Sequence, residues 1–127
     1  CGSGILGIAA LKLKAKYVTL IDTDESAVKV TLDNLALNDI LEDKAQVLLG
    51  TLDMAKNKAQ VILANITANV LINLKDLFYQ YLESDGELIL SGIIDSYTDD
   101  VEKAFEKFSL INHSNLDCWH CYRYKKG

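Results

Sequence analysis

The chain alternates between short apolar runs and longer segments with helical periodicity. β-branched and aliphatic residues dominate four short runs that predict buried strands, at 17–21, 45–50, 60–65 and 87–92. Before the first strand, residues 5–13 are apolar on all sides, as in a helix that packs against a sheet. Between and after the strands, apolar residues recur every three or four positions, which predicts helices over 26–38, 68–82 and 101–108. The predicted buried face of the second helix holds Val28, Leu32 and Leu35. Because strands that alternate with helices form βαβ units with right-handed crossovers, we expect an α/β fold around a mostly parallel sheet.

The end of the chain departs from this alternation. Two strand-like runs, at 109–116 and 118–125, follow one another with only Asp117 between them. This spacing predicts an antiparallel strand pair. Residues 84–86, Ser-Asp-Gly, predict a turn before the strand at 87–92.

Composition bounds the kind of protein. With 127 residues the chain suits one domain, and half of its residues are hydrophobic. No apolar run approaches the ~20 residues of a membrane span. The net charge of −5 argues against general nucleic-acid binding, which needs clustered Lys and Arg. Three unevenly spaced cysteines favour reduced thiols in the cytoplasm over a disulfide framework.

The chain opens with CGSGILG, a glycine-rich stretch that leads into a predicted helix. Gly2 and Gly4 allow backbone to approach a ligand closely. Asp22 ends the next predicted strand, where a carboxylate can accept hydrogen bonds from a ribose diol. The alternative is a tight turn that binds nothing. Gly2, Gly4 and Gly7 formally match the dinucleotide fingerprint, but Asp22 follows Gly7 by fifteen residues, where that fingerprint expects ~20.

Four stretches together are more specific than the loop. CGSGILGIAALKLKAKYVTLIDTD, VILANITANVL, ELILSGII and a late tryptophan, Trp119, follow one another in this order. In this combination the chain resembles class I S-adenosylmethionine-dependent methyltransferases, and most closely the ribosomal protein L11 methyltransferase family. The resemblance implies a three-layer Rossmann-like sheet, mostly parallel, with a C-terminal antiparallel strand pair. It also implies that residues 1–127 are a catalytic domain truncated at its N-terminus, whose first strand is missing from this chain.

The resemblance also implies roles for individual residues. Gly2 and Gly4 would lie under the methionine and ribose parts of S-adenosyl-L-methionine, and Asp22 would bind the ribose hydroxyls. Thr51 and Leu52 would border the adenine. Asn65 would contact the cofactor and act in catalysis. The implied activity is methyl transfer to amino groups, lysine ε-amines or an N-terminal α-amine, of ribosomal protein L11, in the cytoplasm and without a metal or direct nucleic-acid contact.

The chemistry of Asn65 suits this role, since an amide oxygen can hold an amine N–H without stabilising the ammonium as a carboxylate would. The alternative is a strand-end side chain that caps the following helix. Two other functions stay open from the sequence: a nicotinamide-dependent oxidoreductase, and a non-catalytic module with the same fold.

The C-terminal segment CWHC invites a metal or redox interpretation, with His113 nearby. On a strand, Cys118 and Cys121 would point to opposite faces, so we expect neither function. We expect Trp119 to pack in the core or at an edge of the sheet rather than to form a substrate platform.

Overall fold

The computed structural model describes residues 1–127, which divide into two compact units, Cys1–Lys56 and Asn57–Gly127. None of the helices combines the length and the apolar character that a membrane span requires. The elements of the first unit are α1 (Ile5–Lys12), β1 (Val18–Asp22), α2 (Glu25–Leu37), η1 (Glu42–Lys44), β2 (Ala45–Leu49) and η2 (Leu52–Met54).

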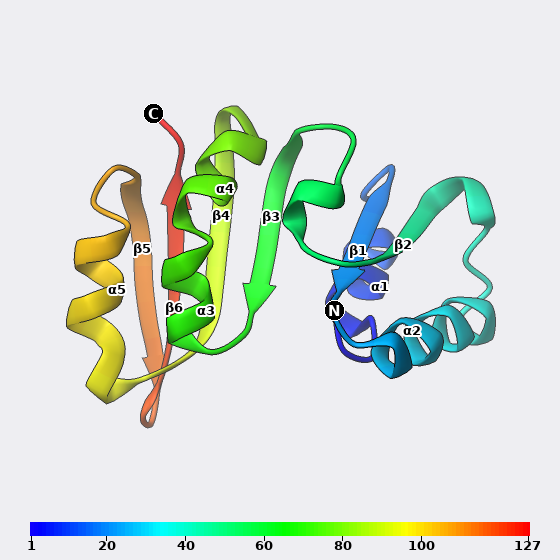
Figure 1. Ribbon diagram of the computed structural model, residues 1–127, viewed down its shortest axis with the longest axis horizontal. Helices are drawn as coiled ribbons and strands as arrows, with labels where there is room; N and C mark the ends of the chain where they lie inside the picture. Colours follow the sequence, from blue (N-terminus) through cyan, green and yellow to red (C-terminus); the bar gives the residue numbers. More distant parts are fainter. The chain divides into compact units, whose positions relative to one another are not determined.

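The first unit is built on two parallel strands. β1 and β2 pair in register from Val18 opposite Ala45 to Asp22 opposite Leu49 (Figure 1). The cap residue of the helix α2 is Asp24, whose side chain accepts the backbone N–H of Ser26.

The buried face of α2 differs from the prediction. Leu35 is buried, but Leu32 is 52% exposed and Thr31 is fully buried instead. Thr31 and Leu35 are four residues apart, so they lie on one side of the helix. The polar Thr31 takes a core position because its hydroxyl has a hydrogen-bond partner there, described below.

The second unit holds a four-stranded sheet in the order β3-β4-β6-β5. Parallel pairing joins β3 to β4, whereas β6 pairs antiparallel with both β4 and β5. Only β6 therefore runs against the other three strands, and the predicted C-terminal antiparallel pair is confirmed. The elements are β3 (Ala59–Asn65), α3 (Ala68–Asn73), α4 (Lys75–Tyr81), β4 (Leu82–Ile94), η3 (Asp95–Tyr97), α5 (Thr98–Ala104), β5 (Ser109–Leu116) and β6 (Trp119–Lys125).

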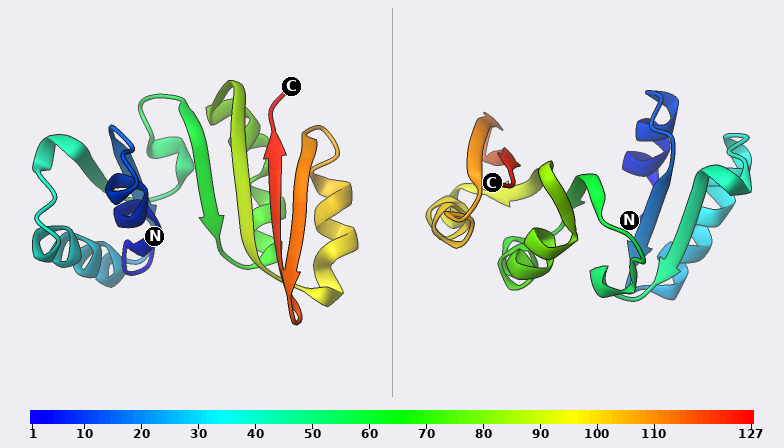
Figure 2. Two further views of the ribbon diagram at one scale, coloured as in Figure 1. Left: turned by 180° about the vertical axis from the view of Figure 1, so that it is seen from behind. Right: turned by 90° about the horizontal axis from the view of Figure 1, so that it is seen from above.

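The helices α3, α4 and α5 cover one face of this sheet, in front of it in Figure 1 and behind it in the left view of Figure 2. Aromatic rings fill the space between the two layers. The fully buried ring of Phe105 lies 6.3 Å from Phe78, 5.6 Å from Phe108 and 5.7 Å from Tyr124, centroid to centroid. Such contacts add packing energy beyond the area that they bury.

Three predictions for this unit were wrong in detail. The helix over 68–82 is two helices that meet at Leu74, whose ψ of 1° departs from helical geometry. The predicted turn at 84–86 lies inside β4 as a bulge, with Asp85 in the left-handed region. The strand β3 is half exposed rather than buried because it lies at the edge of its sheet, with Val61 50% exposed.

Candidate functional site

The glycine loop forms a tight left-handed turn before α1. Gly2 has φ +56° and Gly4 has φ +82°, conformations that other residues rarely adopt. The N–H of Gly4 donates to the carbonyl of Cys1 at 2.8 Å and closes the turn. A Cβ at Gly4 would lie 2.9 Å from Cγ2 of Thr31, whereas a Cβ at Gly2 would meet no atom within 4 Å. The loop is therefore packed against the protein at Gly4 and open at Gly2.

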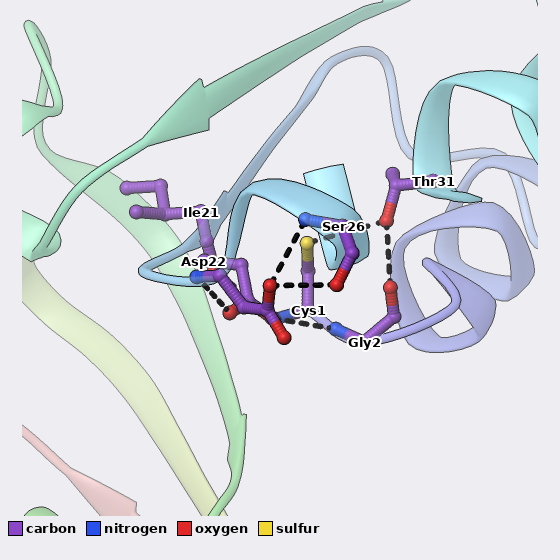
Figure 3. A network of polar contacts seen from close by, with 7 residues as sticks. Cys1, Gly2, Ile21, Asp22, Ser26 and Thr31 are labelled. Atoms are coloured by element: carbon purple, nitrogen blue, oxygen red, sulfur yellow. Dashed lines mark hydrogen bonds and ion pairs between the residues drawn. The ribbon is translucent and has the colours of Figure 1, made fainter. Parts of the chain in front are cut away.

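Asp22 points back from the end of β1 toward this loop (Figure 3). Its Oδ2 accepts the backbone N–H of Gly2 at 2.9 Å and the terminal ammonium of Cys1 at 2.8 Å. Its Oδ1 accepts the N–H of Asp24 at 3.0 Å. A carboxylate offers about four lone-pair positions, so one acceptor position is left for a further donor. The side chain is 20% exposed, so it can be reached.

These donors stabilise the ionised form of Asp22. The ammonium of Cys1, and after it the N–H groups of Gly2 and Asp24, lower the pKa of Asp22 from 3.8 to about 2 against the opposing effect of partial burial. Like any aspartate the group is an anion at neutral pH, suited to accept hydroxyl hydrogens, and the lowered pKa extends the anionic form to lower pH.

Two residues of α2 that the sequence analysis missed hold the loop from the other side. The hydroxyl of the fully buried Thr31 donates to the carbonyl of Gly2 at 2.9 Å and lies 3.3 Å from the sulfur of Cys1. The side-chain amide of Asn34 donates to the carbonyl of Ser3 at 2.8 Å. A polar residue on the predicted apolar side of a helix was the signal that could have found Thr31.

The loop after β2 is fastened next to the end of β1. The N–H of Gly50 donates to the backbone carbonyl of Asp22 at 2.9 Å. Thr51 follows directly, is exposed, and its hydroxyl donates to the carboxylate of Asp53. Leu52 is half-buried and begins η2. Three of the predicted site positions in this unit, Gly2, Gly4 and Asp22, thus belong to one hydrogen-bonded framework, and Thr51 follows Gly50, which is bonded to Asp22.

Asn65 is the last residue of β3 in the second unit, where it is exposed and pairs in register with Ser91 of β4. It does not cap the following helix. The cap position of α3 is Thr67, and no side chain makes a capping hydrogen bond there. The structural interpretation of Asn65 as a helix cap is therefore wrong.

A pocket of about 240 Å³ lies in the second unit. Ser91 and Gly92 line it from β4, and Trp119 and His120 are among the residues that line it from the β5–β6 hairpin. Trp119 was expected in the core or at an edge of the sheet; it is 55% exposed, so the first of these placements is wrong.

The two histidines of the chain, which had no assigned role, form a hydrogen-bonded series beside this pocket. Nε2 of His113 lies 2.8 Å from Nδ1 of His120, and Nε2 of His120 lies 2.5 Å from the carboxylate of Asp95. Cys118 lies in the turn before β6, exposed, rather than on the strand as expected, and Cys121 is half-buried on β6.

Comparison with known proteins agrees on one family. A model of the family described as ribosomal protein L11 methyltransferase matches residues 1–127. A ribosomal protein L11 methyltransferase of Acetivibrio thermocellus is 43% identical over 117 residues, which are 87% of this chain and 37% of that protein. Its counterpart in Campylobacter jejuni is 37% identical over 127 residues, which are 100% of this chain and 44% of that protein. The chain thus spans about two fifths of the length of these curated relatives.

Solved structures agree on the fold. A ribosomal protein L11 methylase of Lactobacillus delbrueckii subsp. bulgaricus has a TM-score of 0.93 at 31% identity, over 99% of this chain and 67% of that chain. An RNA methyltransferase of Salinibacter ruber, solved with S-adenosyl-L-homocysteine, has a TM-score of 0.77 at 17% identity, over 98% of this chain and 74% of that chain. These likenesses confirm the α/β fold of class I methyltransferases that the sequence predicted.

Proposed function

The chain belongs to the ribosomal protein L11 methyltransferase family, and on this basis we propose that it is the catalytic domain of a protein methyltransferase. In the intact protein, methyl groups pass from S-adenosyl-L-methionine to amino groups of ribosomal protein L11. The observation that carries this proposal is the ionised Asp22 carboxylate, bonded to the N–H of Gly2 beside a loop that is open at that glycine.

The residues of the first unit fit the cofactor. Open space beside Gly2 admits a ligand against the backbone. The free acceptor position of Asp22 suits a ribose hydroxyl, because a hydrogen bond to an anion is stronger than one between neutral groups. The missing side chain at Gly4 lets the loop pack closely against Thr31. Thr51 and Leu52 follow the Gly50 contact to Asp22, and we assign them to the border of the adenine.

Asn65 is proposed to align the attacking amine. S-adenosyl-L-methionine, when bound, supplies a methyl group activated by its sulfonium, so the protein mainly has to orient a neutral amine. At pH 7, removing the proton costs about 4.6 kcal/mol for a lysine ammonium and about 1.4 kcal/mol for an α-amino group with a pKa near 8. The Asn65 oxygen can accept one amine N–H and so direct the lone pair, without stabilising the charged form as an anion would.

The proposed acceptor is a lysine ε-amine or the N-terminal α-amine of ribosomal protein L11, and we assign the protein to the cytoplasm with its ribosomal acceptor. The chain carries 18 acidic and 13 basic residues. This excess of negative charge favours encounter with a basic protein over contact with nucleic acid.

Calorimetry and turnover test the proposal. We expect the intact protein to bind S-adenosyl-L-homocysteine and not NAD; binding of NAD alone would return the oxidoreductase interpretation. We expect Asn65→Ala to keep the affinity for S-adenosyl-L-homocysteine within about threefold and to lose most of its turnover on ribosomal protein L11, as orientation contributes several kcal/mol to such reactions. Cofactor binding with no methylation of the wild type would indicate a non-catalytic module. Unchanged turnover of Asn65→Ala would remove Asn65 from the mechanism.

A further inference from the structure

Gly92 of β4 lies against the side chain of Asn65. It follows Ser91, the register partner of Asn65, and its φ is +79°. A Cβ built on Gly92 would collide with Oδ1 of Asn65 and lie 3.6 Å from Cγ of the same side chain. The carbonyl oxygen of Ile66 would also lie close, at 3.4 Å. The space that a side chain would occupy at position 92 is thus filled by the Asn65 carboxamide.

Asn65 is exposed, and the backbone of Gly92 is a neighbour that its carboxamide meets on β4. The last torsion of an asparagine side chain is broad, and a neighbour is needed to confine it. The backbone of Gly92 supplies that neighbour from the adjacent strand.

We propose that Gly92 is a positioning residue, whose missing side chain provides the seat that directs Oδ1 of Asn65 toward the acceptor amine. Gly92 also lines the pocket of about 240 Å³ on its other side, of which Asn65 is not a lining residue. The inference rests on the role proposed for Asn65 above. It adds that the orientation of the carboxamide, and not only its presence, limits the reaction.

A double-mutant cycle in the intact protein tests this. The variants are Gly92→Ala, Asn65→Ala and the two combined, each measured for kcat and KM with ribosomal protein L11, for affinity to S-adenosyl-L-homocysteine and for Tm. We expect Gly92→Ala to lower kcat by about 100-fold, the effect of a misplaced group, with KM and cofactor affinity within about twofold. Added to Asn65→Ala, the same substitution should change kcat by less than about twofold, since the oriented group is gone.

The cycle also separates the collision from backbone strain. The left-handed φ strains the backbone of an alanine at position 92 both in the wild type and in Asn65→Ala. The collision with the carboxamide exists only when Asn65 is present. Gly92→Ala should therefore lower Tm more with Asn65 than with Ala at that position. If Gly92→Ala does not fold, recovery of folding in the double variant supports the seat, and failure of both overturns it.

The outcomes distinguish this inference from the proposed function. A Gly92→Ala variant with wild-type kcat, beside an inactive Asn65→Ala, overturns the positioning role and leaves the function intact. If Gly92→Ala lowers Tm equally with Asn65 and with alanine at position 65, the inference that Gly92 seats the carboxamide is overturned. Wild-type turnover of Asn65→Ala overturns the function assigned to Asn65, while the Tm comparison still decides whether Gly92 seats it.

Discussion

Replacing Asp22 by asparagine is the sharpest test of the cofactor site. Asp22 uses both carboxylate oxygens as acceptors, Oδ2 for the N–H of Gly2 and Oδ1 for the N–H of Asp24. Asparagine has one acceptor oxygen, and its other terminal group is a donor. In Asp22→Asn one of the two backbone N–H groups therefore faces an NH₂ group and loses its partner.

The magnitude follows from the hydrogen bonds that are lost. A hydrogen bond to a charged group contributes about 1.5–3 kcal/mol, and removing one such bond weakens both the loop and the acceptor offered to the ribose. With 1.36 kcal/mol for each factor of ten, the Kd for S-adenosyl-L-homocysteine should rise by roughly 10- to 150-fold. Asp22→Asn also removes one negative charge from the site. The control variant removes the same charge nearby, so the comparison of the two variants cancels this effect.

The control is Asp24→Asn, two residues away. Asp24 uses only Oδ1, which accepts both the N–H and the hydroxyl of Ser26, so asparagine can replace it fully. Asparagine and aspartate are about equally good helix caps, and we expect a Kd within about twofold of the wild type. Both values come from calorimetry of the intact protein, with circular dichroism to check folding. A folded Asp22→Asn variant with wild-type affinity would refute the assignment of the ribose site.

Two further predictions concern the loop and pH. Thr31→Val removes the hydroxyl bonded to the carbonyl of Gly2 but keeps the shape of the side chain; thermal unfolding should show a loss of about 1–2 kcal/mol, and Thr31→Ser, which keeps the hydroxyl, should lose less. In the chain of residues 1–127, where the terminal ammonium of Cys1 is the main cause, the folded-state pKa of Asp22 is lowered from 3.8 to about 2. Its contribution to stability in this chain is therefore complete above pH 3.8 and is lost as the pH falls through 2. For a partly exposed group we expect this contribution to be about 1 kcal/mol, so the gap in unfolding free energy between wild type and Asp22→Asn should narrow by that amount from pH 5 to pH 2. A gap that stays constant or widens over this range would contradict the lowered pKa.

Local patterns in the sequence were sufficient to predict most of the strands and helices. The alternation of strands and helices and the position of Asp22 at the end of the first strand both follow from short-range patterns. No glycine or proline marks the break at Leu74. The continuous apolar periodicity therefore predicted one helix over 68–82 where the structure has α3 and α4.

The residues that hold the glycine loop and Asn65 in place could not be predicted, because their tertiary contacts leave no local pattern in the sequence. Thr31 and Asn34 meet the loop across about thirty residues of sequence, and only the packing of α2 brings them there. The seat at Gly92 depends on the register between β3 and β4, which the sequence does not state. Predicted functions of the cofactor loop and of Asn65 stay predictions until binding and turnover are measured.

The reversed direction of β6 has an evolutionary consequence. Its first residue, Trp119, pairs with the last residue of β4, Ile94, so the hairpin tip before β6 arrives at the edge where the parallel strands end. A hairpin tip contributes nothing to the sheet interior and tolerates insertions and substitutions. One rim of the pocket can therefore change in sequence and length while the strands beneath it stay unchanged.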